Sequence, residues 1–169
     1  MKRTPRGRER STACRVDAAR NGLGVIAERH FRSRSTIAPL RGRIVHWNEL
    51  WRRSRQFASN CIRCGPETYL DPGRSIGRYL NHACEPNAGI RKSGRRLVLF
   101  AARAIRRGEE IVIDYSTTIG DDDIWRMKCK CGARRCRGWI VRFGSLPTRR
   151  RQSYVRRGLV PDFILATLG

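Results

Sequence analysis

The apolar positions of this chain fall into short runs that are separated by turn residues. Residues 97–102 are continuously apolar and follow a Lys-Ser-Gly turn at residues 92–94, and this combination predicts a β-hairpin over residues 88–102. Residues 111–115 are rich in β-branched side chains and follow an Arg-Gly turn, so we expect a further strand there.

The N-terminal half has the same character. Residues 22–31 contain two glycines and then a short β-prone run, residues 42–47 predict another strand, and residues 48–57 favour one or two helical turns. Many short strands joined by glycine-containing turns are typical of a mainly β domain, which we expect at residues 16–116. A chain of 169 residues is long enough for one such domain with short extensions.

The two ends of the chain differ from this pattern. Residues 1–15 are basic and lack an apolar run, so we expect a flexible arm and not a secretory signal. Near the other end, Pro147 precedes a basic segment that stops at Gly158, and this predicts one helix over residues 147–157. No apolar run approaches the roughly 20 residues that a transmembrane helix needs.

The charge of the chain is strongly positive. It has 37 basic and 14 acidic residues, a net charge of +23. Such an excess favours a polyanionic partner, which could be a nucleic acid, an acidic protein face or a membrane surface. Because 33 of the 37 basic residues are arginine, a general bias in composition could account for part of the excess.

Three of the seven cysteines are close together in sequence. Cys129, Cys131 and Cys136 form a C-x-C-x4-C pattern, and three thiolates at this spacing can bind one zinc ion. A structural zinc site needs four ligands, and Cys84 is the candidate for the fourth. Without a secretory signal, seven cysteines indicate a reducing compartment, where metal binding is more common than disulfide formation.

The remaining thiols and imidazoles predict less. Cys61 and Cys64 form a C-x-x-C pair with no second pair at a zinc-finger distance, and we interpret them as packing residues, with Cys14 uninvolved. His30 and His46 are interpreted as structural histidines. The C-x-C-x4-C triplet could itself be three unrelated reduced cysteines.

Four motifs occur in a fixed order along the chain: NGLGVIA, RYLNHACEPN, GEEIVIDY and CKCGARRCRGW. Together they resemble the SET domain family with its post-SET zinc segment. The resemblance implies a mainly β fold, the SET β-clip of short twisted sheets, with a C-terminal pseudoknot at which the second and third motifs meet. It divides the chain into an arm, a SET domain, a post-SET zinc segment and a C-terminal helical extension, at residues 1–15, 16–116, 125–141 and 142–169.

Members of this family are mostly protein-lysine N-methyltransferases that use S-adenosyl-L-methionine, and the resemblance implies the same activity here. Tyr115 would be the catalytic residue, with its hydroxyl beside the transferred methyl group and in contact with the cofactor. The other residues that the resemblance assigns to cofactor binding are Leu23, Gly24, Arg78, Asn81, His82 and Trp139. The zinc would be structural, bound by Cys84, Cys129, Cys131 and Cys136.

Several alternatives stay open at this point. Taken singly, Tyr115 and Trp139 could be core aromatics, and Arg78 could be one surface arginine among 33. Many active family members have a tyrosine where this chain has Leu40, so the degree of methylation is not predicted. A non-catalytic SET-like module and a zinc-stabilised nucleic-acid-binding protein are the alternative functions.

The resemblance also suggests partners and a location. We expect a protein substrate with an exposed lysine, such as a histone-like or ribosomal protein, and non-specific contact with nucleic acid through the basic surface. The protein is expected to be a monomer without membrane attachment. We expect it inside a cell. A bacterial protein would be in the cytoplasm. A eukaryotic protein, or a secreted effector, would be in the nucleus or on the chromosome.

Overall fold

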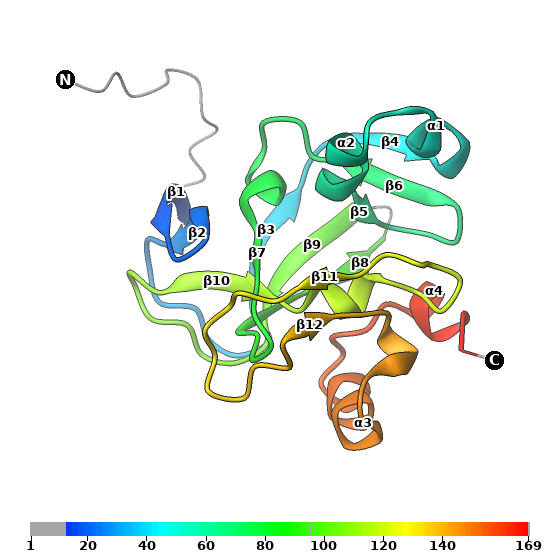
Figure 1. Cartoon of the computed structure of the whole chain (residues 1–169). Coiled ribbons are helices and arrows are strands. Elements are labelled where there is room, and N and C mark those ends of the chain that lie inside the picture. Colours follow the sequence, from blue (N-terminus) through cyan, green and yellow to red (C-terminus); the bar gives the residue numbers. More distant parts are fainter. Residues whose placement is uncertain (1–12, 95, 169) are drawn as a thin grey trace.

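The computed structural model describes residues 13–94 and 96–168, which form several small sheets and not one large one (Figure 1). The first sheet has the strand order β1-β2-β10-β7. Its strands are β1 (Cys14–Ala19), β2 (Gly22–Ala27), β10 (Glu110–Ile113) and β7 (Asn81–His82). Strand β10 runs antiparallel to β2 and parallel to β7, so the second and third motifs lie side by side as predicted.

The second sheet contains the predicted hairpin. Strands β8 (Ala88–Ser93) and β9 (Arg96–Ala101) are antiparallel neighbours, and β3 (Thr36–Leu40) pairs with the other edge of β9. The hairpin prediction is confirmed, and Gly94 has the positive φ of 58° that its turn requires. Strand β9 is central and its apolar run is buried, which explains why that run is continuous and not alternating.

The third sheet consists of β4 (Arg43–His46), β6 (Thr68–Asp71) and β5 (Ile62–Arg63). Two short helices, α1 (Trp47–Arg52) and α2 (Arg55–Asn60), follow β4, as the sequence predicted for this segment. The ring of His46 accepts a hydrogen bond from the backbone N–H of Asn48 and so caps α1, which is a structural role.

The C-terminal part is built around short elements. A 3-10 turn η2 (Tyr115–Thr118) leads to the small hairpin of β11 (Met127–Lys128) and β12 (Trp139–Ile140). After these come η3 (Phe143–Ser145), α3 (Thr148–Arg156) and α4 (Asp162–Leu165). Helix α3 confirms the predicted basic helix to within one residue at each end, and Gly158, at a φ of 65°, follows its end.

Three differences from the sequence-based expectations are local. The strand predicted over residues 111–115 stops at Ile113, because the side chain of Asp114 accepts a hydrogen bond from the N–H of Ser116 and starts η2. Strand β1 begins at Cys14, inside the predicted arm, whose residues 1–12 lie outside the described residues. Helix α4 was not predicted.

Two apolar clusters hold these parts together. The larger one fills the space between the sheets and includes Cys14, Val25, Leu99 and Ile111. The smaller one joins β9, through Phe100, to the C-terminal extension. Its other buried members are Phe143, Leu146, Tyr154, Leu159, Val160, Phe163 and Ile164.

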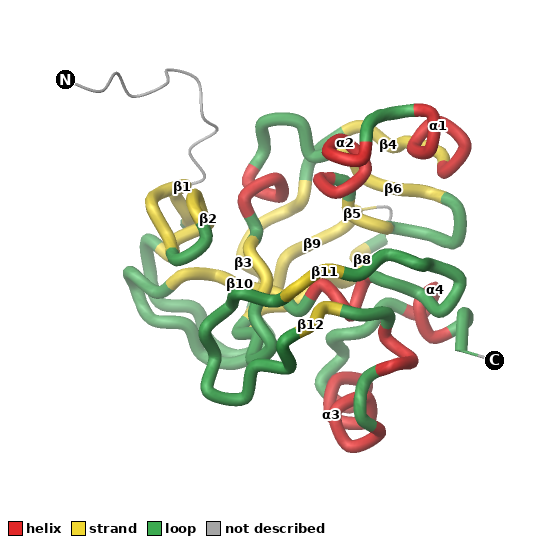
Figure 2. Tube along the Cα trace, in the orientation of Figure 1, coloured by secondary structure: helices red, strands yellow, loops and turns green. Residues whose placement is uncertain are grey.

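The extension packs closely on the second sheet. A Cβ atom on Gly89 of β8 would lie 2.6 Å from Leu159 Cδ2, so no larger residue fits there without displacement. Helices α1 and α2 lie on one side of the strands, and α3 and α4 lie on the other (Figure 2). In the described part of the chain, none of the helices has the length and apolar character that a bilayer span requires.

We expect Phe143→Ala to lower the free energy of unfolding by about 3–5 kcal/mol, because it removes a large side chain from a closely packed site. Phe143 is fully buried in the smaller cluster. Urea denaturation followed by circular dichroism measures the change. Ile124→Ala is the control: Ile124 is 89% exposed, and its loss should change stability by less than about 0.5 kcal/mol. Similar effects for the two variants would contradict the importance of this cluster.

Candidate metal and cofactor site

Four metal-ligating side chains converge where the loop after β7 meets the β11–β12 hairpin. The ligating atoms of His82, Cys84, Cys129 and Cys131 all lie within 4.8 Å of one another. Cys84 Sγ and Cys129 Sγ are 3.7 Å apart. Two sulfur atoms at about 2.3 Å from one tetrahedral zinc ion would be about 3.8 Å apart, so this pair has the spacing of a zinc site.

The backbone around the thiols is arranged for thiolates. The N–H groups of Arg137, Cys131 and Gly138 each lie 3.4 Å from a sulfur, that of Cys84, Cys129 and Cys136 respectively. Without a metal, burial raises the pKa of the Cys84 thiol to about 11 and also raises that of Cys129. At Cys131, hydrogen bonds from backbone N–H groups and neighbouring thiols outweigh burial and lower the pKa to about 7. The donor set therefore fits a zinc ion. Of the four predicted ligands, Cys136 is not in this group, and its thiol is within hydrogen-bonding reach of Cys129 and Cys131.

The hydrogen bonds of His82, the one histidine of this group, determine which of its ring nitrogens carries the proton. Its Nδ1 accepts a hydrogen bond from the backbone N–H of Tyr115, at 3.2 Å. Burial lowers the pKa of His82 to about 4, against the opposite influence of Asp114, so the ring is neutral and its proton is on Nε2. Nε2 lies 3.4 Å from Cys84 Sγ and can only donate to it. In this tautomer His82 can donate a hydrogen bond to a Cys84 thiolate, as groups beside a metal ligand commonly do.

A buried carboxylate ties this region together. Asp114 is fully buried, and both its oxygens accept hydrogen bonds from the guanidinium of Arg137, at 2.7 and 2.9 Å. The Tyr154 hydroxyl donates to the same carboxylate at 2.8 Å. Arg137 belongs to the cysteine-rich segment and Tyr154 to α3, so Asp114 connects both of them to the end of β10.

Helix α3 also contacts the loop that carries Cys84. The Tyr154 hydroxyl lies 3.2 Å from the Cys84 carbonyl oxygen, and the Arg150 guanidinium donates to the same oxygen. The carbonyl and the thiol of Cys84 are thus held from two sides, by α3 and by the cysteine-rich segment.

A second group of predicted residues meets where β2, β7 and β10 adjoin. The Asn81 amide nitrogen donates to the Leu23 carbonyl, at 3.1 Å, and to Glu110 Oε1, at 2.8 Å. Both partners are acceptors, which fixes the orientation of the amide and leaves Asn81 Oδ1 without a partner in the described part of the chain. A Cβ on Gly24 would lie 2.4 Å from Glu110 Oε1 and 2.6 Å from Ala19 Cβ, so a larger residue would have to displace its neighbours.

Tyr115 lies between the two groups. Its hydroxyl donates to the Leu80 carbonyl at 2.6 Å, and its ring is 5.4 Å from that of His82. Burial, with a smaller contribution from Glu110, raises the pKa of Tyr115 to about 12. The hydroxyl is therefore neutral at physiological pH, and because its one hydrogen is used, its oxygen is left as an acceptor.

The profile of the SET domain family matches residues 22–116, more than half of the chain. The chain belongs to the SET domain family. The predicted family membership and the mainly β fold are confirmed.

Similar proteins include long SET-domain enzymes of eukaryotes. "Histone-lysine N-methyltransferase trr" of Drosophila melanogaster is 33% identical over 130 residues, which are 70% of this chain and 5% of that protein. "Histone-lysine N-methyltransferase, H3 lysine-36 specific" of Aspergillus fumigatus is 30% identical over 138 residues, 74% of this chain and 14% of that protein. "Histone-lysine N-methyltransferase, H3 lysine-4 specific" of Saccharomyces cerevisiae is 38% identical over 89 residues, which are 49% of this chain and 8% of that protein. This chain thus covers only a small part of the length of each of these relatives.

The remaining predicted site residues are more exposed. Arg78, on η1 (Ile76–Tyr79), is exposed and forms no ion pair with another described residue. Trp139 is 43% exposed and has the Arg126 guanidinium 5.4 Å from its ring centroid. Leu40, at the position where many SET domains have tyrosine, is buried in the larger apolar cluster.

The cysteines interpreted as packing residues lie away from the zinc-like cluster. Cys14 and Cys64 belong to the larger apolar cluster. The Cys61 thiol donates to the Phe57 carbonyl.

Asp114, Glu110 and Tyr154 were not predicted to belong to the site, and Arg137 was expected only to offset the charge of the thiolates. Asp114 and Glu110 are within a quoted motif, where an acidic residue next to an assigned one could have been noticed. Tyr154 gave no such signal, because only the packing of α3 brings it to Asp114.

Asp114→Asn should lower the free energy of unfolding by about 3–5 kcal/mol, because it leaves the partly buried Arg137 charge without a counter-charge. Urea denaturation measures this. The exposed Asp17, which pairs with Arg15, provides the control, and Asp17→Asn should leave the free energy of unfolding almost unchanged. Combining Asp114→Asn with Arg137→Met should cost less than the sum of the two single changes. Additive effects would show that the pair is not coupled.

Proposed function

We propose that this SET domain transfers methyl groups from S-adenosyl-L-methionine to a lysine side chain of a protein substrate. The observation that carries the proposal is the convergence of Tyr115, Asn81 and His82 beside the Leu23–Gly24 backbone, within the residues that the family profile matches. The names of the relatives, all histone-lysine N-methyltransferases, support the same reaction.

A structural zinc ion would be bound by Cys84, Cys129, Cys131 and Cys136. It would join the loop after β7 to the β11–β12 segment, which belong to sequence regions about 45 residues apart. Arg137 and the lysines beside these cysteines would offset the charge of the thiolates, and His82 would donate to Cys84. Zinc binding would thereby contribute to the folding of residues 127–140.

The cofactor, when bound, supplies a methyl group on an electrophilic sulfonium. Residues that would hold it are Leu23, Gly24, Arg78, Asn81, His82 and Trp139. Asn81 Oδ1, which has no partner in the described part of the chain, can accept a hydrogen bond from an α-ammonium group. The Arg78 guanidinium is suited to a carboxylate, and the exposed face of Trp139 to a planar base or a cation.

Tyr115 would position the lysine amine. Its hydroxyl is held by the Leu80 carbonyl, so its oxygen can accept a hydrogen bond from the amine in a fixed direction. Holding two reactants in line can supply up to about 7–11 kcal/mol of an activation barrier. Leu40 is apolar and offers no second hydroxyl for this purpose.

The substrate class follows from the relatives and from the chemistry of the site. A histone, a ribosomal protein or another basic protein with an exposed lysine would serve as the acceptor. We propose such a protein as the substrate, with the monomer as the active form.

Tyr115→Phe should reduce methyl transfer by about 10²–10³-fold, the usual effect of removing one preorganised hydrogen-bonding group. Transfer of a radiolabelled methyl group to mixed histones and ribosomal proteins measures it, and mass spectrometry identifies the methylated lysines. Tyr69→Phe is the matched control, since Tyr69 lies on β6 outside the site. Calorimetric binding of the cofactor should be retained in both variants. Cofactor binding without transfer by the wild-type protein would instead favour a non-catalytic module.

Cys131→Ser should abolish the bound zinc and destabilise the cysteine-rich segment, because a tetrahedral site loses one of its thiolates. Plasma mass spectrometry of the purified protein should find one zinc per chain in the wild type. Cys61→Ser, which removes a thiol outside the cluster, should leave the zinc content unchanged. A wild-type protein without zinc after purification in zinc-containing medium would refute the metal site.

A further inference from the structure

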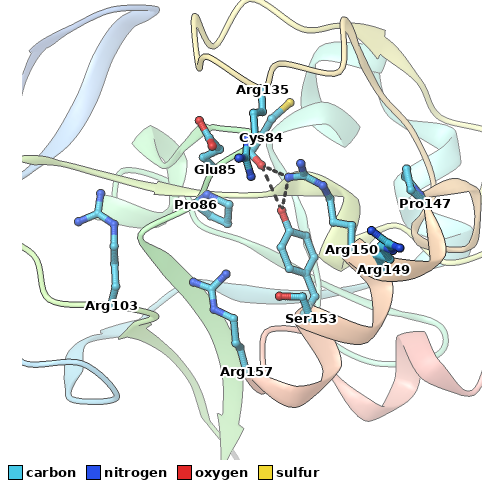
Figure 3. Close-up of a pocket in the computed structure, with 11 residues that line it drawn as sticks. Cys84, Glu85, Pro86, Arg103, Arg135, Pro147, Arg149, Arg150, Ser153 and Arg157 are labelled. Carbon is cyan, nitrogen blue, oxygen red and sulfur yellow. Dashed lines mark hydrogen bonds between the residues drawn. The ribbon is translucent and has the colours of Figure 1, made fainter.

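An open cleft of about 730 Å³ lies between α3 and the loop that carries Cys84 (Figure 3). Of its eleven lining residues, five are arginines and one is acidic. These are Arg103, Arg135, Arg149, Arg150, Arg157 and Glu85. The arginines come from three separate segments: the loop after β9, the cysteine-rich segment and α3.

The helix presents its arginines to the cleft because of their spacing. Arg149 and Ser153 are four residues apart on α3, and Arg157, the residue that caps its end, continues the same spacing, so the three lie along one face. Tyr154, on the adjoining stripe of the helix, packs against the protein and fixes the orientation of this face. Figure 3 shows Arg157 and Arg103 directed into the same open space beside Pro86.

Of the five arginines, only Arg103 has an acidic partner among the described residues. Arg103 pairs with Glu109, and Arg150 is bound to the Cys84 carbonyl. Arg135, Arg149 and Arg157 form no ion pair with any residue of 13–94 or 96–168. Glu85 alone does not neutralise them, so the cleft carries a net positive charge.

The cleft adjoins the proposed zinc site through Cys84, which contributes to both, and is separate from the proposed cofactor site. The Cys84 carbonyl points to Arg150 and Tyr154 at the cleft, whereas the Cys84 thiol points to Cys129. Neither Tyr115 nor Asn81 lines the cleft.

We propose that this arginine cleft binds the phosphodiester backbone of a nucleic acid. The guanidinium group matches a phosphate with two parallel hydrogen bonds. Interfaces with nucleic acid are much more positively charged than interfaces between proteins, so a cleft with five arginines and one carboxylate favours nucleic acid over an acidic protein. The net charge of +23 would add long-range attraction. The proposal does not depend on methyl transfer, because its readout is binding.

The test compares two double variants of equal charge. R149Q/R157Q removes two unpaired arginines of the cleft. R52Q/R74Q removes two exposed arginines without an ion pair among the described residues; Arg52 ends α1, across the molecule from α3 (Figure 1). Fluorescence anisotropy with a labelled duplex DNA and with a labelled single-stranded RNA gives the dissociation constants over a series of salt concentrations.

We expect R149Q/R157Q to weaken binding at least about tenfold at low salt. For duplex DNA, the slope of log K against the logarithm of the salt concentration should become less steep by about 0.9 for each phosphate contact that is removed. The two substitutions should therefore reduce it by about 2 in total. R52Q/R74Q should change both quantities much less. Tighter binding of the DNA or of the RNA identifies which nucleic acid is the preferred source of the phosphodiester, and either result supports the cleft.

Glu85→Gln provides a change in the opposite direction, which loss of folding cannot imitate. Removing the one carboxylate of the cleft should tighten binding by about two- to threefold. Thermal unfolding followed by circular dichroism checks that all variants fold.

Equal weakening by the two double variants would overturn the proposal, since it would mean attraction to net charge alone. Displacement of the nucleic acid by polyglutamate at an equal concentration of charge would instead assign the cleft to an acidic protein. Displacement by anionic vesicles or by inorganic phosphate would assign it to a membrane surface or to a small anion.

Discussion

The buried carboxylate of Asp114 is the interaction on which the arrangement of this molecule depends. It lies at the end of β10, where it accepts hydrogen bonds from Arg137 and Tyr154 and from the backbone N–H of Ser116. A charge in this position is tolerated only when it is paired and fully hydrogen-bonded. The requirement brings the cysteine-rich segment and α3 to the same place, because each of them supplies one of the partners that Asp114 needs.

The positions of the proposed zinc site and of the arginine cleft both depend on the contacts of Asp114. With Arg137 bound to Asp114, its backbone N–H reaches the Cys84 sulfur, and the neighbouring cysteines are brought to the thiol. With Tyr154 bound to the same carboxylate, α3 lies against the Cys84 carbonyl and presents its arginines beside it. A zinc ion would thus lie on the thiol side of Cys84, and a phosphate group of a nucleic acid would lie on its carbonyl side. Asp114 orients the groups around both sites.

Much of this could be predicted from local sequence. The hairpin over residues 88–102 and helix α3 appear where turn residues and prolines indicated, since both depend on contacts between near neighbours. Strands of two residues, such as β5 and β7, could not be predicted, because so short a segment has no periodicity of its own. The strand predicted through residue 115 ended early for a similar reason: the Asp114 side chain replaces a sheet hydrogen bond with a turn.

The sequence by itself determined the family, the mainly β fold and the set of residues around which a site could form, because these are written in motifs of fixed spacing. Only the tertiary structure decided what those residues do to one another. The donating tautomer of His82, the free carbonyl oxygen of Asn81 and the contact of Arg150 with a carbonyl 66 residues away arise from hydrogen bonds between distant parts of the chain. Such bonds depend on how the sheets and α3 pack in three dimensions, and local propensity carries no information about them.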